Sequence, residues 1–142
     1  MTYLLDTCLV SELLKPRPSR TVSAWLAGQR EENLHLSVLT LGEVQKGVAQ
    51  FPESRKKARL QSWLDRDLRD RFRGRIVPIN EAVALTWGRV SGDALARGRP
   101  LPVIDALIAA TAIVFDATVV TRDEEGILDA GAKTVNPWEP QV

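Results

Sequence analysis

Short apolar runs alternate with longer amphipathic stretches along the chain. The first run, Tyr3-Leu4-Leu5, stops at Asp6, as expected of a short buried strand. Besides residues 3–5, the sequence predicts strands over residues 34–37, 75–79, 117–121 and 133–135. Between them, apolar residues recur at every third or fourth position, which predicts helices over 9–15, 21–27, 39–49, 54–71, 80–97 and 102–115.

Helix-breaking and helix-capping residues agree with several of these boundaries. Pro16 and Pro18 stop the first helix, Asn80 is placed to cap the fifth, and Gly98 closes it. Strands that alternate with helices favour an α/β fold with a central parallel sheet of about four to five strands, flanked by helices on both faces. The 142 residues contain no repeat or linker, so we expect a single domain over 1–142.

Composition narrows the class of protein. Apolar residues make up 44% of the chain and charged residues 26%, as in ordinary globular domains. No apolar stretch is long enough to cross a bilayer, and the N-terminus reaches Asp6 without the regions of a signal peptide. Cys8 is the single cysteine, which excludes an internal disulfide and a cysteine-based zinc site. We therefore expect a protein of the reducing cytoplasm that binds no membrane.

Charge is unevenly distributed, although the net charge is only +1. Residues 55–75 carry nine Lys or Arg against three Asp, and the rest of the chain carries ten against fifteen Asp or Glu. Solvated charges on a long helix would explain this difference. A basic surface for a polyanion, facing an acidic cluster elsewhere, would explain it equally well. Charge alone leaves both interpretations open.

Several common active sites are missing from the sequence. Gly42 and Gly47 have the spacing of a phosphate-binding loop, but the Lys and Ser or Thr that must follow are absent. The only histidine, His35, lies in a predicted buried strand, where a packed imidazole is a simpler interpretation than a catalytic base. Cys8 is interpreted in the same way, as a small apolar residue near the start of a helix.

Acidic residues occupy more informative positions. Asp6 ends the first strand and Asp123 follows the fourth, and ligands bind at the carboxyl ends of strands in an open parallel sheet. Asp105 lies in the first turn of an apolar helix, where an acid also favours the helix dipole. Glu43 lies near the start of its helix, where a solvated pair with Lys46 is the structural alternative.

Together these four acids predict a metal site. Carboxylates that converge at one sheet edge repel and raise one another's pKa values unless a cation lies between them. An all-oxygen site suits Mg²⁺ or Mn²⁺ rather than zinc. Such an ion can activate a water for attack on a phosphodiester, and the basic segment would then hold the nucleic-acid backbone.

The acidic residues also lie in motifs that follow one another along the chain. These motifs are Leu4-Leu5-Asp6-Thr7, Val10-Ser11-Glu12-Leu13, Lys15-Pro16, Leu41-Gly42-Glu43 with Gly47-Val48, Asp105-Ala106-Leu107-Ile108-Ala109-Ala110-Thr111-Ala112, Val120-Thr121-Arg122-Asp123 and Asn136-Pro137-Trp138. In this order they resemble the motifs of a PIN domain of the VapC toxin type, and the last is similar to the close of its FitB-like subgroup. The resemblance spans essentially the whole chain.

The resemblance implies a PIN-domain fold and a Mg²⁺- or Mn²⁺-dependent endoribonuclease, the toxin of a type II toxin–antitoxin pair. In such an enzyme a metal-activated water attacks the RNA. The family's metal-site acids match Asp6, Glu43, Asp105 and Asp123. Auxiliary roles fall to Thr7, Thr121 and Arg122, and RNA contacts are expected from Lys46, Arg55, Lys56, Lys57 and Arg59. The resemblance also implies a homodimer and a small VapB-like antitoxin as partner.

Two positions depart from the family pattern. Cys8 stands where Asn is common, and a thiol is a poorer hydrogen-bond partner for Asp6 or water. Gly126 stands where many relatives carry a further Asp, and the neighbouring Glu124 and Glu125 are candidates to replace that acid.

Other functions therefore stay open. A PIN-like module that binds RNA or protein without cleaving it is favoured by Cys8. A phosphoacceptor domain that uses Asp6 would need a lysine at a strand end, and the sequence offers none. Three tryptophans, Trp25, Trp63 and Trp87, are expected in the core, with a dimer or antitoxin groove as the alternative.

Overall fold

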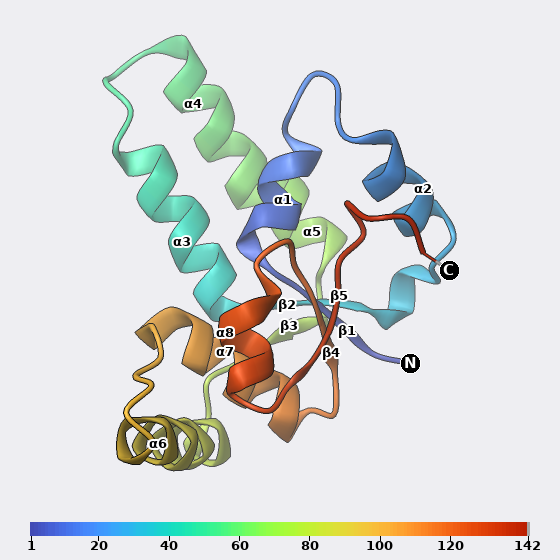
Figure 1. The fold of residues 1–142 in the computed structure, drawn as a ribbon. Helices are drawn as coiled ribbons and strands as arrows, with labels where there is room; N and C mark the ends of the chain where they lie inside the picture. The colour runs from blue at the N-terminus through green and yellow to red at the C-terminus, as the bar shows by residue number, and fades with distance from the viewer. Residues whose placement is uncertain (142) are drawn as a thin grey trace.

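Five parallel strands form the central sheet, in the order β3-β2-β1-β4-β5 (Figure 1). The computed structural model describes residues 1–141. The strands are β1 (Tyr3–Leu5), β2 (Leu34–Ser37), β3 (Ile76–Val77), β4 (Thr118–Val120) and β5 (Lys133–Val135). The predicted α/β fold with a parallel sheet is confirmed, although β3 and β4 are shorter than the sequence pattern indicates.

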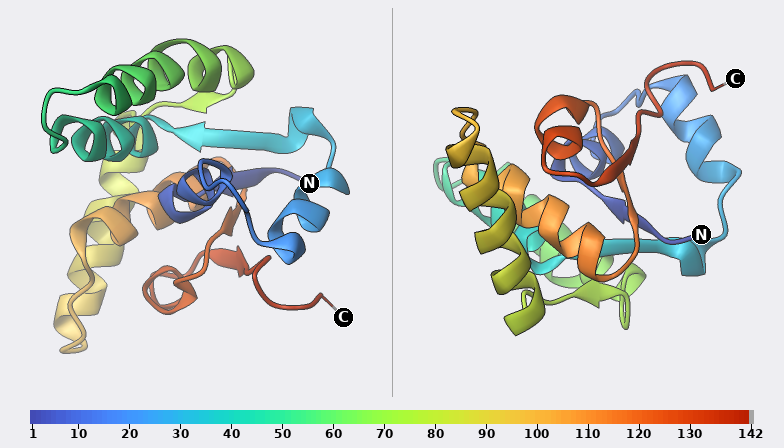
Figure 2. Two further views of the ribbon diagram at one scale, coloured as in Figure 1. Left: turned by 90° about the horizontal axis from the view of Figure 1, so that it is seen from above. Right: turned by 60° about the horizontal axis from the view of Figure 1, so that its bottom comes forward.

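Helices connect the strands and cover both faces of the sheet (Figures 1 and 2). They are α1 (Thr7–Leu13), α2 (Arg20–Ala27), α3 (Val38–Ala49), α4 (Arg55–Ser62), α5 (Arg69–Arg71), α6 (Glu81–Ala96), α7 (Val103–Val114) and α8 (Glu124–Asp129), with a 3-10 turn η1 (Glu31–Asn33). A π-helical stretch, η2 (Trp63–Leu68), joins α4 to α5. Within residues 1–141 no helix has the length and apolar character needed to cross a membrane.

The helices differ from the prediction mainly at their ends. Helix α1 begins at Thr7 rather than at residue 9, because the Asp6 side chain accepts a hydrogen bond from the Thr7 amide and caps the helix. Helix α6 ends at Ala96 with Arg97 as its C-cap, and Gly98 follows as predicted, with a φ of +72° that glycine adopts without strain. Helix α8 is absent from the prediction, because its six residues contain a single buried side chain, Ile127, and are too few to show apolar residues recurring at every third or fourth position.

Side chains alternate along the strands and divide the core between the two faces of the sheet. Leu5 and Val120 belong to a cluster that packs beneath α1, α2, α3 and η2. Leu4 and Val119, one position earlier on each strand, belong to a second cluster beneath α6, α7 and α8. Burial of strand residues on two faces explains why β1 appears as a continuous apolar run, whereas β5, at the edge of the sheet, begins with the exposed Lys133.

The aromatic residues behave in part as expected. Trp25 and Trp63 pack against the first cluster, and Trp25 meets Tyr3 edge to face, with ring centroids 4.9 Å apart. His35 is only half-buried, and its Nδ1 lies 3.2 Å from the carbonyl of Asn33. The expectation that His35 is a structural imidazole therefore holds, but at the margin of the core.

The strand order places a crevice at the carboxyl ends of β1 and β4. The chain builds outward from β1 through β2 to β3, and then returns to add β4 and β5 on the other side of β1. The connections that leave β1 and β4 therefore diverge and open a crevice between them. Such a crevice is the usual position of a ligand site in a parallel sheet. The amide of Asp6 donates to the carbonyl of Val120 over 3.0 Å, so the first and fourth motifs are hydrogen-bonded neighbours.

We expect that Phe72→Ala lowers the free energy of unfolding by about 3–5 kcal/mol, because the change leaves a cavity under a fully buried ring. The matched control is Phe51→Ala, since Phe51 is 36% exposed and should change stability by only about 0.5 kcal/mol. Urea unfolding of both variants checks this prediction. Equal losses would contradict the described core.

Candidate active site at the carboxyl edge of the sheet

Four acidic side chains surround the crevice between β1 and β4. Asp6 follows β1, Glu43 lies in α3, Asp105 lies in the first turn of α7, and Asp123 immediately precedes α8. Burial raises the pKa of Asp105, and the charges of Asp6, Asp123 and Glu43 raise it further. The structure therefore brings the four acids singled out in the sequence within electrostatic reach of one another.

Asp6 is held in one orientation by two hydrogen bonds. Its Oδ1 accepts from the Thr7 amide and its Oδ2 accepts from the Thr121 hydroxyl, both over 2.8 Å. Thr121 is fully buried, and its hydroxyl oxygen also accepts from the Asp123 amide over 3.1 Å. Thr121 thus links the acid after β1 to the backbone of the acid after β4.

Glu43 is tied to the same network through the second threonine. The Thr7 hydroxyl donates to Glu43 Oε1 over 2.5 Å. Glu43 is half-buried, and within residues 1–141 it forms no ion pair with Lys46. A contact with Thr7, rather than a solvated pair on the helix surface, accounts for its position.

Cys8 makes only weak sulfur contacts with this network, including one of 3.6 Å between its Sγ and Thr121 Oγ1. Its Sγ is 3.9 Å from Asp6 Oδ2 and accepts a weak hydrogen bond from the Arg122 amide over 3.5 Å. Burial raises the pKa of the Cys8 thiol, and the nearby Asp6 and Asp123 charges act in the same direction. Asp6 takes its short bonds from Thr7 and Thr121, and Cys8 adds only a weak sulfur contact to them.

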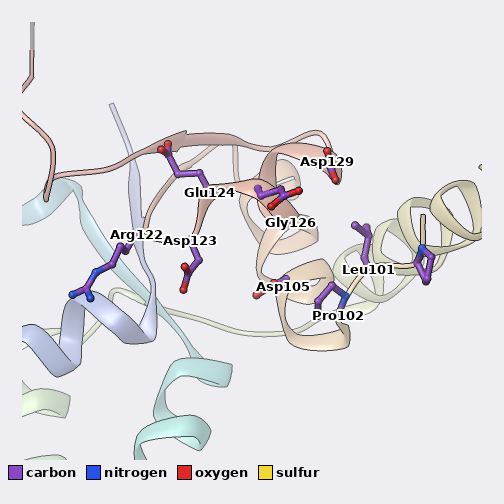
Figure 3. Close-up of a pocket in the computed structure, with 10 residues that line it drawn as sticks. Leu101, Pro102, Asp105, Arg122, Asp123, Glu124, Gly126 and Asp129 are labelled. Carbon is purple, nitrogen blue, oxygen red and sulfur yellow. The ribbon is translucent and has the colours of Figure 1, made fainter. Parts of the chain in front are cut away.

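A cavity of about 550 Å³ opens beside the acids. Asp105, Asp123 and Asp129 line it, together with Leu101, Pro102, Arg122 and residues 124–126 (Figure 3). Figure 3 shows Glu124 turned away from Asp105 and Asp123, and its carboxylate accepts a hydrogen bond from the Thr134 hydroxyl. That contact disfavours Glu124 as a replacement for the family's additional acid.

Gly126 has a specific place in this cavity. A Cβ built at position 126 would lie 2.9 Å from Asp105 Oδ2, closer than real contacts of this kind allow. An aspartate at 126 would therefore collide with Asp105 as it stands. The departure from the family pattern leaves one Asp105 oxygen open to the cavity, a consequence that the sequence alone did not reveal.

The donor set fits a hard divalent cation that keeps much of its water. All four candidate ligands are carboxylates, the oxygen donors that Mg²⁺ and Mn²⁺ prefer. As arranged in residues 1–141, no three Asp, Glu, His or Cys side chains gather closely enough to hold one ion among them. Mg²⁺ commonly binds through only one or two carboxylates plus waters, so a site built from this donor set need not use more than two of the four acids.

The predicted RNA-binding residues are not brought to the acids as one group. Lys46 lines a second hollow, of about 520 Å³, together with Glu43 and Thr7. The others, Arg55, Lys56, Lys57 and Arg59, lie on α4, which begins at the tip of the α3–α4 hairpin, away from the crevice (Figure 1).

Part of the basic segment has a structural role. Arg71 and Arg75 both pair with Glu31, and Arg75 also donates to the carbonyls of Glu31 and Leu34. These contacts tie the end of the long helix to β2. The positive charge counted over residues 55–75 is therefore only partly available to a polyanion.

Comparisons with known proteins agree with this geometry. A family model described as PIN domain matches residues 3–133. Toxin FitB from Neisseria gonorrhoeae is 37% identical over 95% of this chain and 97% of its own, and VapC ribonuclease Y4jK from Sinorhizobium fredii is 34% identical over 96% and 98%. The solved structure of FitAB bound to the IR36 DNA fragment contains a chain with a TM-score of 0.93 and 35% identity, covering 99% of both chains.

We expect that Asp105→Asn stabilises the metal-free protein at neutral pH. The pKa of Asp105 is raised above its usual 3.8, so the folded state binds this proton more tightly than the unfolded chain does. The free energy of unfolding of the wild type therefore falls as pH rises from about 3.8 through the raised pKa of Asp105. The amide side chain of the Asp105→Asn variant does not titrate, so the variant does not lose this stability. In EDTA, the melting temperature of the variant should exceed that of the wild type by a few degrees at neutral pH and converge with it in acid. A variant that melts lower at neutral pH would contradict the described cluster.

Proposed function

The chain belongs to the PIN-domain family, and we propose that it works as an endoribonuclease, the toxin of a type II toxin–antitoxin pair. One observation carries the proposal: the four acids of the family motifs share one sheet edge, where burial and three neighbouring charges raise the pKa of Asp105. Relatives named toxin FitB and VapC ribonuclease support the same activity.

The proposal extends to the organisation of the protein. Residues 1–142 form one PIN domain, which acts as a homodimer in the cytoplasm, where its RNA substrate is found. A small VapB-like antitoxin binds the domain and inhibits its activity. The similarity to toxin FitB supports this pairing. The unpaired thiol of Cys8 is compatible with a reducing compartment.

Asp6 and Asp105 would hold the cation, Mg²⁺ or Mn²⁺, and Glu43 and Asp123 would complete the site. When bound, the cation supplies positive charge that offsets the negative charge developing on the attacked phosphate. Thr121 and Thr7 fix the direction of Asp6, and Thr7 also restrains Glu43. Ligands held before substrate arrives need not reorganise during the reaction.

The carboxylates also move the proton. A water attacks the phosphorus atom and a carboxylate takes its proton, while the bond from phosphorus to the leaving ribose oxygen breaks and that oxygen takes a proton from solvent. Asp123 lines the cavity next to Asp105 and is the acid best placed to accept it. Lys46 and the α4 residues Arg55, Lys56, Lys57 and Arg59 then contact RNA that extends beyond the cavity.

A second candidate function is a PIN-like module that binds RNA or protein without cleaving it. Cys8 favours it, because a thiol replaces the amide common in the family. The bonds from Thr7 and Thr121 to Asp6 support the nuclease instead, since they are the short hydrogen bonds that orient Asp6 and neither comes from position 8.

The decisive experiment is cleavage of total bacterial RNA by purified, antitoxin-free protein with Mg²⁺ or Mn²⁺. We expect discrete fragments that disappear in EDTA, and a rate at least about 100-fold lower for Asp105→Asn, since it removes a proposed ligand. The matched control is Asp129→Asn, which changes an acid of the same cavity that pairs with Arg99, and this variant should cleave normally.

An active, folded Asp105→Asn protein would overturn the assignment of the site. Absence of cleavage by a folded wild type that still binds Mn²⁺ would favour the non-cleaving module. In that event Cys8→Asn is the first substitution to examine, because recovery of cleavage would locate the defect at position 8.

A further inference from the structure

Glu12 is a buried charge that the proposed reaction does not use. It lies on α1, and of the charged residues within the described part of the chain it alone is buried, with 3% of its side chain exposed. An isolated buried carboxylate is strongly disfavoured, so its retention requires compensating partners. Those partners connect three separate segments of the chain at the edge of the cavity.

Four donors surround the Glu12 carboxylate. Oε1 accepts from Lys15 Nζ over 3.1 Å, from Arg122 Nη2 over 3.2 Å and from Trp138 Nε1 over 3.1 Å. Oε2 accepts from the Ser19 amide over 3.1 Å. Burial acts to raise the pKa of Glu12, but the bonds from Trp138, Lys15 and Ser19 hold it below its usual range. The side chain is therefore an ionised anchor.

Arg122 is held on two sides by this anchor. Its guanidinium bonds to Glu12 and lies 4.4 Å from the centre of the Trp138 ring, in a cation–π arrangement. About half of the side chain, 49%, nevertheless stays exposed. A planar guanidinium with one face on an aromatic ring and one Nη group bonded to a carboxylate still has N–H groups free for a further acceptor.

The position of Arg122 matters because it adjoins the acids. It directly precedes Asp123 and lines the same cavity as Asp105. Figure 3 shows its guanidinium at one side of that cavity, with Asp123 lying between it and Asp105. A loose arginine beside four carboxylates would be drawn toward them by Coulomb attraction and would neutralise the site. Within residues 1–141 its one ion pair is with Glu12 instead.

The charges of the cluster add a reason to expect an anion at this place. Glu12 carries one negative charge, whereas Lys15 and Arg122 carry two positive charges, so the group has one positive charge in excess. A phosphate suits a guanidinium through two parallel hydrogen bonds. The cluster thus presents a fixed cation next to the proposed cation site, with the correct sign for a nucleic-acid backbone.

We propose that Glu12 is a positioning residue which, with the Trp138 ring, holds Arg122 at the rim of the cavity to bind a backbone phosphate of single-stranded RNA. This inference rests on the proposed function for the identity of the substrate. It assigns the phosphate contact to a position that helix α1 and Trp138, near the carboxyl end of the chain, fix together.

A double-mutant cycle tests the proposal. The probe is a short, fluorescently labelled single-stranded RNA of mixed sequence, bound to protein that carries Asp105→Asn so that it is not cut. Arg122→Gln should weaken binding about tenfold, because it removes a charge-assisted contact. It should also lower the slope of log Kd against log salt by about 0.7, the amount expected for one phosphate. Glu12→Gln should act in the same direction.

The cycle separates positioning from general stability. If Glu12 acts through Arg122, then Glu12→Gln weakens binding no further when Arg122→Gln is already present. Trp138→Leu, at a half-buried position, provides a second route if Glu12→Gln folds poorly, and it should also lower the salt slope. The control is Arg30→Gln, an exposed arginine paired with Glu32 before β2, which should leave binding and slope unchanged.

Additive losses, or an unchanged salt slope in Arg122→Gln, would overturn the proposal. Failure of the proposed function is distinguishable, because cleavage by the wild type is measured separately from binding. A wild type that binds RNA without cutting it contradicts the nuclease, whereas a non-additive cycle in that protein still supports the role of Glu12.

Discussion

Repulsion among four carboxylates at one sheet edge is the constraint on which the rest of the site depends. Asp6, Glu43, Asp105 and Asp123 are brought there by the ends of two strands and the starts of two helices. Each backbone position is fixed by apolar packing elsewhere, in the two clusters on opposite faces of the sheet. The fold therefore maintains a charge arrangement that is unfavourable without a cation.

Hydroxyl groups hydrogen-bond to two of these carboxylates without neutralising their charge. Thr121 and Thr7 donate to Asp6 and Glu43, which orients the carboxylates and leaves their charges in place. The nearby cation, Arg122, is kept apart from the acids by Glu12 and Trp138. Two sets of contacts thus act together. The threonine hydroxyls orient the carboxylates of the site, and the buried Glu12 holds Arg122 to one side of them.

Much of this arrangement could be predicted from the sequence, and the reasons are local. Asp6 and Asp123 follow apolar strands, and the carboxyl ends of neighbouring parallel strands meet at one edge. The predicted strands and most helices followed from periodicity and from caps such as Asn80. Glu43 and Asp105 became candidates only together with the two strand-end acids, because single acids in a first or second helical turn have ordinary structural explanations.

The remainder depended on contacts between distant segments. Glu12 bonds to Arg122 and Trp138, which are 110 and 126 positions further along the chain. No sequence pattern in α1 predicts those partners. The effect of Gly126 on Asp105 likewise required the packing of α8 against α7. The π-helical stretch η2 has the same apolar spacing as its α-helical neighbours, so the sequence predicted one uninterrupted helix.

The most direct test of the central claim is calorimetric titration of the metal-free protein with Mn²⁺, comparing wild type with Asp105→Asn. If the acids are arranged for a cation, the wild type binds Mn²⁺ saturably and releases more protons as the pH is lowered, because the cation competes with the proton for Asp105, whose pKa is raised by burial and by its acidic neighbours. The variant should bind more weakly and release fewer protons. A wild type that binds no Mn²⁺, or a variant that matches it in affinity and proton release, would contradict the claim.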